Sequence, residues 1–130
     1  YGHVVTAERD WAAENDEAVR AFLRATARGA AWAQSNPGDA IDALIDANGV
    51  LEESRGQQRQ KWETMATEFM TGDVVAEHGW GWSENEPWQV VHDALADTDA
   101  LDGEVDPTSV WTNGYLDTEY EYIGSYTDTV

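Results

Sequence analysis

Cysteine is absent from this chain of 130 residues, and cationic side chains are scarce. Without cysteine, the described sequence can form no disulfide and no thiolate site. Seven lysine and arginine residues face 26 aspartate and glutamate residues, which gives a formal net charge of −19. No lysine or arginine follows Lys61. Because such a charge distribution repels a phosphate backbone, the composition argues against nucleic-acid binding.

Long hydrophobic runs and the common catalytic motifs are missing as well. Apolar stretches are short and interrupted, so none is typical of a membrane-spanning helix. The sequence contains no phosphate-binding loop, dinucleotide fingerprint or Gly-x-Ser-x-Gly motif. Glu119 and Glu121 form a carboxylate pair, but on a polar extended segment both are expected to face water. We therefore predict a non-catalytic protein that needs no cofactor.

The acidity allows two interpretations. A carboxylate-rich, lysine-poor surface stays soluble in a salty medium, where salt screens self-repulsion. Alternatively, the carboxylates could bind a cation or a cationic ligand. Residues 97–103 resemble a calcium loop at first, yet Leu101 takes a ligand position and Asp102 takes the position of the required glycine. Salt adaptation accounts for more of the acidic residues, and we favour a halophilic surface.

Hydrophobic periodicity predicts a mostly helical chain that begins with one strand. Val4, Val5 and Thr6 are β-branched and predict a short buried strand. The predicted helices cover residues 15–34, 37–47, about 52 or 54 to 70, and about 83–86 onwards, with one or two helical turns within residues 107–116. Residues 74–83 are expected to be irregular, 97–106 to form an acidic loop, and 118–130 to form a polar tail.

Several side chains receive packing roles from this pattern. Residues expected on core-facing helix positions include Leu44, Leu95 and the tryptophans Trp32, Trp62 and Trp88. Arg20, Arg24 and Arg28 are spaced by four and form one stripe of a helix. Anion binding or docking is one interpretation of that stripe. The one we favour is ion pairing with carboxylates of neighbouring helices, with the arginine stems covering apolar surface.

Three sequence blocks, in order, carry a resemblance to a known family. They are residues 1–40, with Val4-Val5-Thr6 and the run from Asn15 to Ala40, then Glu86-Pro87-Trp88-Gln89-Val90-Val91, and finally the block from Val105 to Leu116 that ends in Thr112-Asn113-Gly114-Tyr115-Leu116. Together they resemble the C-terminal part of solute-binding proteins of ABC importers. The branch in question binds thiamine pyrimidine precursors, riboflavin and related small molecules.

The resemblance implies an α/β fold of the type II periplasmic-binding-protein kind, of which this segment is mostly helical with one hinge-proximal strand. Residues 1–7 would be the returning hinge strand, 8–117 helices packed on the first lobe, and 118–130 a tail. The implied partners are a small-molecule solute and an ABC permease. The implied location is extracellular or at the cell surface, with a lipid anchor on a cysteine outside this sequence.

Four residues are the predicted ligand contacts. In the resembled fold the hinge strands line the floor of the cleft, which favours Tyr1 and His3. Trp80 and Trp82 lie in a glycine-rich loop, where they could stack on a flat solute. For Trp80 and Trp82 the alternative is packing at the edge of a core. For Tyr1 and His3 it is a packed or solvent-facing pair. His78 and His92 have no partner at a metal-ligand spacing, so we predict no metal site.

Three other functions remain open from sequence. Some proteins of the same scaffold synthesise a thiamine pyrimidine, but they are expected to use a reactive histidine and cysteine cluster. A nitrate- or sulfonate-type solute-binding protein is a second alternative. A tryptophan-rich carbohydrate-binding module is a third, which the predicted helical positions of the tryptophans disfavour.

Overall fold

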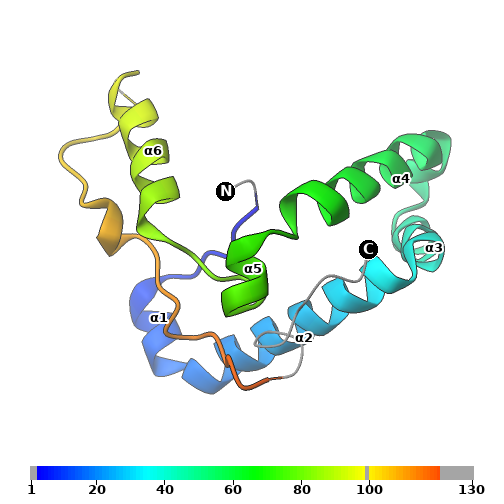
Figure 1. The fold of residues 1–130 in the computed structure, drawn as a ribbon, viewed down its shortest axis with the longest axis horizontal. Helices are drawn as coiled ribbons and strands as arrows, with labels where there is room; N and C mark the ends of the chain where they lie inside the picture. The colour runs from blue at the N-terminus through cyan, green and yellow to red at the C-terminus, as the bar shows by residue number, and fades with distance from the viewer. Residues whose placement is uncertain (1–2, 99, 121–130) are drawn as a thin grey trace.

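The computed structural model describes residues 3–98 and 100–120. Within those ranges the structure is helical and contains no strand (Figure 1). The α-helices are α1 (Arg9–Glu14), α2 (Asp16–Ser35), α3 (Pro37–Ala47), α4 (Arg55–Thr64), α5 (Asp73–His78) and α6 (Asn85–Ala96). Shorter elements are the 3-10 helices η1 (Gly49–Ser54) and η3 (Pro107–Ser109) and the π-helix η2 (Met65–Phe69).

Helix α2 forms the base of the molecule, and the other helices rise from it as two arms (Figure 1). One arm contains α3 and α4, beyond the C-terminal end of α2. The other contains α6 and stands over α1 and the beginning of α2, while α5 lies between the arms. The predicted helices over residues 15–34, 37–47 and from 83–86 onwards are confirmed, because α2, α3 and α6 cover them.

Asparagines lie at the junctions between successive helices. Asn15 ends α1 and begins α2, and its side-chain Nδ2 donates to the Trp11 carbonyl oxygen at 2.8 Å. Asn36 joins α2 to α3 in the same way, with Nδ2 donating to the Trp32 carbonyl oxygen at 2.9 Å. Asn15 thus occupies the predicted N-cap position, but its amide satisfies a carbonyl at the end of the preceding helix.

Helix α1 was not predicted, and its N-terminus is held by Glu8. The two carboxylate oxygens of Glu8 accept hydrogen bonds from the backbone N–H groups of Asp10 at 3.0 Å and Trp11 at 2.6 Å. These bonds satisfy two of the free donors that every helix N-terminus carries. Because they favour the ionised carboxylate, they lower the pKa of Glu8 below its ordinary value, with the bond from Asp10 as the largest cause.

Acid and the Glu8→Ala substitution are both expected to loosen α1. The lowered pKa means that the cap contributes fully above the ordinary carboxyl range, near pH 4, and is lost as the pH falls through the lowered value. Amide hydrogen exchange at Asp10 and Trp11 should accelerate in the variant and, in the unsubstituted protein, at acidic pH after correction for intrinsic exchange. Equal protection of these amides in both proteins would contradict the capping role.

Among the described residues, the buried hydrophobic side chains larger than alanine lie in the arm built from α3 and α4. Ile41 and Ile45 of α3 are buried, and α3 contacts both α2 and α4. Across the α2 interface the indole Nε1 of Trp62 donates to the Ala33 carbonyl oxygen at 3.1 Å. Trp62 therefore has a packing role, as predicted. The predicted long helix to residue 70 is present as η1, α4 and the π-turn, in which the Met70 N–H donates to the Met65 carbonyl oxygen at 3.0 Å.

Several predictions of element type and burial were wrong. Residues 74–83 were expected to be irregular, yet α5 covers the first part of this segment. Trp32 is 47% exposed, Leu44 is 41% exposed and Leu95 is 40% exposed, although helical periodicity placed all three in a core. Periodicity identifies the apolar face of a helix, but it cannot show which surface covers that face.

The predicted strand at the N-terminus is not formed within the described residues. Residues 3–8 have no regular secondary structure, and Val4 and Val5 are more than half exposed. A strand exists only through hydrogen bonds to a neighbouring strand, and no described segment offers one. The predicted tail is described only as far as residue 120, and the remainder of it lies outside the described residues.

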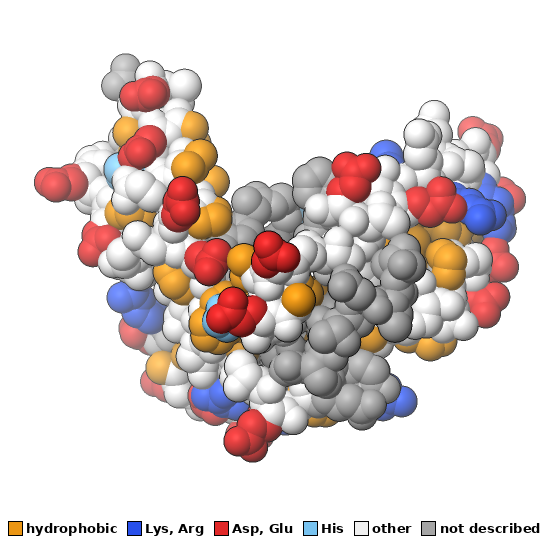
Figure 2. All heavy atoms as spheres, in the orientation of Figure 1, with side chains coloured by type: hydrophobic (Ala, Val, Ile, Leu, Met, Phe, Trp, Pro, Cys, Tyr) orange, Lys and Arg blue, Asp and Glu red, His pale blue; other side chains and the backbone are white. Residues whose placement is uncertain are grey.

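The hydrophobic core is small for a chain of this length. Among the described hydrophobic residues, only Ala12, Ala27, Ile41, Ile45 and Ala66 are buried. By contrast, ten large hydrophobic side chains are exposed, including Val90 of α6 and Val110 after η3. Figure 2 shows hydrophobic side chains along the edge of α6 that faces the other arm. None of the described helices is long and apolar enough to cross a membrane.

Candidate functional site

A six-residue aromatic loop, residues 78–83, connects α5 to α6 and is the candidate site. Two glycines shape it: Gly79 ends α5 with φ +87°, and Gly81 has φ +90°. Positive φ angles are disfavoured for residues with a Cβ atom. At Gly81 a Cβ would also lie 3.3 Å from Leu116 Cδ2. The glycines therefore allow the chain to turn at residues 80–81, with Gly81 packed closely against Leu116.

His78 and Trp82 stack on each other within this aromatic loop. Their ring centroids lie 4.6 Å apart and the ring planes differ by 18°. Both side chains, and that of Trp80, are partly exposed. An indole held flat by a neighbouring ring loses little conformational freedom when a further planar group stacks on it. The loop is therefore suited to contact a flat ring.

Asn113 holds the end of the aromatic loop in place. Its side-chain Oδ1 accepts a hydrogen bond from the Ser83 backbone N–H, and its Nδ2 donates to the Ser83 carbonyl oxygen, both at 2.9 Å. A single amide side chain thus satisfies both backbone groups of one loop residue. Through these two bonds the position of Asn113 sets the position of the residue next to Trp82.

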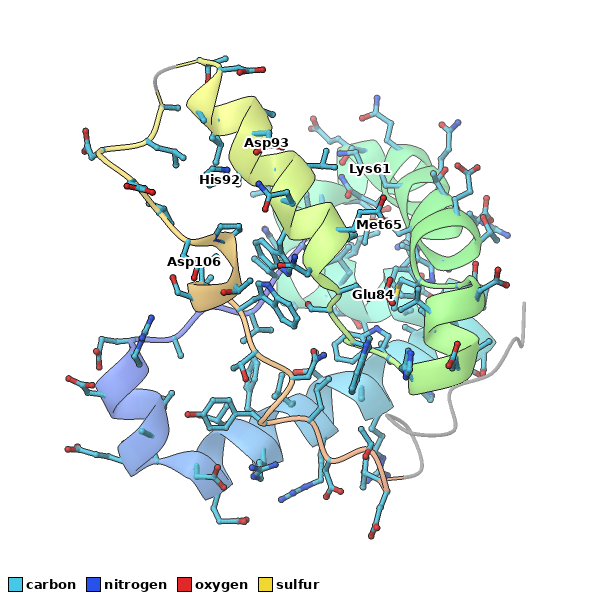
Figure 3. All side chains as sticks on the ribbon, turned by 60° about the vertical axis from the view of Figure 1, so that its left-hand side comes forward. Lys61, Met65, Glu84, His92, Asp93 and Asp106 are labelled. Carbon is cyan, nitrogen blue, oxygen red and sulfur yellow. The ribbon has the colours of Figure 1, made fainter. Side chains whose placement is uncertain are left out.

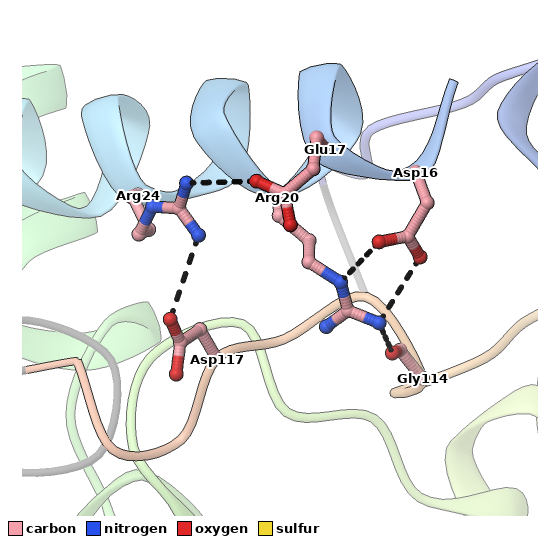
Figure 4. Close-up of polar contacts among 6 residues, drawn as sticks. All are labelled: Asp16, Glu17, Arg20, Arg24, Gly114 and Asp117. Carbon is pink, nitrogen blue, oxygen red and sulfur yellow. Dashed lines mark hydrogen bonds and ion pairs between the residues drawn. The ribbon is translucent and has the colours of Figure 1, made fainter.

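The segment that carries Asn113 is in turn fixed to α2 by two arginines (Figure 4). Arg20 donates to the Gly114 carbonyl oxygen at 2.8 Å and forms a bidentate ion pair with Asp16 at 2.7 and 3.1 Å. Arg24 pairs with Asp117, with 3.5 Å between Nη1 and Oδ2. Pairing of the arginine stripe with carboxylates is confirmed for Arg20 and Arg24, but the partners are Asp16 in α2 itself and Asp117 in a non-helical segment, and not the predicted carboxylates of neighbouring helices.

The ion pair with Arg20 perturbs its carboxylate partner. The guanidinium of Arg20 lowers the pKa of Asp16 below its ordinary value, chiefly through the side-chain hydrogen bonds. Arg20 also lies over the ring of Tyr115, with its Cζ 5.8 Å from the ring centroid. Arg20 therefore connects α2 to two consecutive residues of the segment that supports the aromatic loop.

A second feature is an open hollow between α6 and the loop that follows it. Its lining residues are His92, Glu104, Val105, Asp106 and Pro107. Figure 3 shows His92 and Asp93 on α6 and Asp106 on the facing loop. Hydrogen bonds from His92 and then Gln89 lower the pKa of Asp93, while bonds from the Thr108 side chain and N–H lower that of Asp106. Asp93 and Asp106 are therefore each held by hydrogen bonds from nearby residues.

The structure brings together only some of the predicted site residues. Trp80 and Trp82 share the aromatic loop. His3 is exposed before α1, and no described hydrogen bond or ring contact joins it to that loop. Tyr1 lies outside the described residues. Within the described part of the chain no three histidine or acidic side chains gather as metal ligands would.

Sequence reasoning missed the contributions of His78 and Asn113. The spacing of four between His78 and Trp82 was visible, but α5 ends at His78 and the positive-φ residues Gly79 and Gly81 lie between the two, so helical spacing could not pair them. Asn113 was noted only as part of the motif ending in Leu116. An asparagine between Thr112 and Gly114 indicates a turn, yet no sequence signal named Ser83 as its partner.

Comparison with known proteins supports the resemblance seen in the sequence blocks. Residues 1–40 match the family model described as "NMT1/THI5 like". The chain resembles NMT1/THI5-like proteins. The riboflavin-binding protein RibY of Chloroflexus aurantiacus is 28% identical over 107 residues, which cover 80% of this chain and 30% of RibY. The chain therefore spans less than a third of the length of that relative. No solved structure matches this chain.

Proposed function

We propose that this chain is part of an extracytoplasmic solute-binding protein of an ABC importer. In this proposal it captures a flat heterocyclic solute, such as riboflavin or a thiamine pyrimidine precursor, for delivery to a permease. The similarity of residues 1–40 to NMT1/THI5-like proteins and the similarity of most of the chain to a riboflavin-binding protein carry the proposal.

The small core supports the idea that these helices form one wall of a larger lobe. Exposed apolar side chains occur on α1, α2, α6 and the segment after η3, where Trp11, Phe22, Val90 and Val110 are all more than half exposed. A monomeric soluble protein rarely exposes a large contiguous apolar surface, and Figure 2 shows hydrophobic side chains gathered along α6. We propose that residues 8–117 pack on the remainder of the first lobe.

The exposed residues 3–7 fit a returning hinge strand in the same proposal. Val4 and Val5 lack a described neighbour, and a β-branched segment that pairs with a strand from the remainder of the lobe would become covered on both faces. Closure of two lobes about such a hinge would then enclose the solute. Residues 118–130 would form a surface tail.

The solute is proposed to stack on the aromatic loop, with Trp82 as the main contact and Trp80 beside it. Trp82 is held by His78 on one side and by the Asn113–Ser83 bonds at its chain neighbour. Tyr1 and His3 would contact the same solute from the hinge. This arrangement places the preformed ring stack on this chain and leaves the second wall of the site to the other lobe.

Replacing Trp82 by alanine is expected to weaken binding of riboflavin to the complete protein about tenfold or more, since one stacking contact contributes on the order of 1–3 kcal/mol. Isothermal titration calorimetry measures the effect. Trp32→Ala is the matched control, because Trp32 is a half-exposed tryptophan of α2. Unchanged affinity in the Trp82 variant would remove the aromatic loop from the site, and absence of binding by the unsubstituted protein would contradict riboflavin as the solute.

A further inference from the structure

The aromatic loop is surrounded by carboxylates and carries no lysine or arginine. Residues 73–86 contain Asp73, Glu77, Glu84 and Glu86, against no lysine or arginine. Glu77 precedes the stacked His78, and its Oε1 lies 3.8 Å from His78 Nε2. The side chain of Glu77 is 75% exposed, so its charge faces the solvent beside the stack. Figure 2 shows red carboxylates and no blue cation over α5 and α6.

The two cations that support the loop from α2 are already neutralised. Arg20 is engaged with the carboxylate of Asp16, and Arg24 lies between Glu17 at 3.8 Å and Asp117 at 3.5 Å. Figure 4 shows both guanidinium groups directed at the segment that carries Gly114 and Asp117. Arg20 and Arg24 therefore supply structure rather than a free positive charge for a solute.

We propose that the aromatic loop selects a neutral or cationic flat heterocycle and discriminates against the phosphate ester of the same ring system. This inference rests on the proposed function, because it assigns the charge class of the solute at the same site. A phosphate brought near several carboxylates meets unfavourable Coulomb energy, which low ionic strength leaves largely unscreened. The ring faces of Trp82 and His78 attract a planar group irrespective of its phosphorylation.

The same charge distribution disfavours nitrate and sulfonate as solutes at this loop. Recognition of a small oxyanion needs a cationic side chain or a cluster of free N–H donors. In the aromatic loop, the Ser83 backbone N–H already donates to Asn113 Oδ1. A flat organic solute without negative charge satisfies both the aromatic and the electrostatic character of the site.

Two matched ligand pairs test the inference in the complete protein: riboflavin with riboflavin 5′-phosphate, and thiamine with thiamine phosphate. Binding is measured by calorimetry at low ionic strength and again with added sodium chloride. We expect the phosphate ester of the ring that binds to be bound about tenfold more weakly or worse, and the difference to narrow as salt screens the carboxylates.

A pair of variants links the effect to the loop. Glu77→Gln should raise the affinity for the phosphate ester relative to the unphosphorylated ring. Glu53→Gln makes the same change at an exposed residue of η1 in the other arm. It should leave the ratio of the two affinities, for the phosphate ester and for the unphosphorylated ring, unaltered. Equal or tighter binding of the phosphate ester would overturn the inference while the proposed function stands. Failure of both ring systems to bind would overturn the proposed function and the inference together.

Discussion

The Ile45→Ala substitution is expected to lower the free energy of unfolding by about 2–5 kcal/mol. Ile45 is 6% exposed and lies one turn after Ile41, which is also buried. Removal of three carbon atoms costs the transfer free energy of those atoms and also leaves a cavity that the neighbouring helices fill only partly. With few other buried hydrophobic side chains in the described residues, little remaining packing can offset this loss.

Urea denaturation of the complete protein, followed by circular dichroism, measures the change. Val50→Ala is the matched control because Val50 of η1 is 85% exposed, and its truncation is expected to change stability by less than about 0.5 kcal/mol. Similar midpoints for the Ile45 and Val50 variants would show that the arm of α3 and α4 is not packed as described.

The Asn113→Ala substitution is expected to have the second-largest effect, and to act on the aromatic loop. It removes both hydrogen bonds to the backbone of Ser83, which is only partly exposed. A buried or partly buried polar group left without its partner costs about 1–3 kcal/mol. Loosening of Ser83 should also move Trp82, so affinity for a stacked solute should fall together with stability.

Two further variants separate the loss of the Asn113–Ser83 hydrogen bonds from a general loss of packing. Asn113→Asp retains an acceptor for the Ser83 N–H but places a carboxylate oxygen against the Ser83 carbonyl oxygen. Above the carboxyl pKa range, it should therefore lower stability at least as much as Asn113→Ala does. Asn85→Ala, in the exposed first turn of α6, should be close to neutral. Amide hydrogen exchange at Ser83 reports directly on its hydrogen bond to Asn113. Unchanged protection of this amide in the Asn113→Ala variant would refute the supporting role of Asn113.

Sequence reasoning predicted the long helices because their signals are local. Asn15, Asn36 and Pro37 mark junctions by their own backbone and capping preferences, and the structure places helix boundaries at these residues. The asparagine amides bond to the preceding helix instead of the following one, a choice that depends on the relative orientation of the two helices. Residue type alone could not determine it.

The failed predictions of burial and of the strand depended on contacts between distant residues. Whether Trp32 or Leu95 is covered depends on which surface packs against the helix, and whether Val4 and Val5 form a strand depends on a partner strand. The candidate site shows the same limit. Sequence indicated Trp80 and Trp82 from their glycine-rich surroundings, but Asn113 reaches Ser83 across 30 residues, and only the fold brings them together.

The continuity of α2 determines how far apart the two arms are held. Its 20 residues form an uninterrupted rod about 30 Å long, at roughly 1.5 Å for each residue. A regular helix without an internal proline or a π-bulge resists sharp bending, so the arms cannot approach each other by flexing their common support. We therefore expect a spin-label pair on α3 and α6 to keep one separation whether or not solute is present.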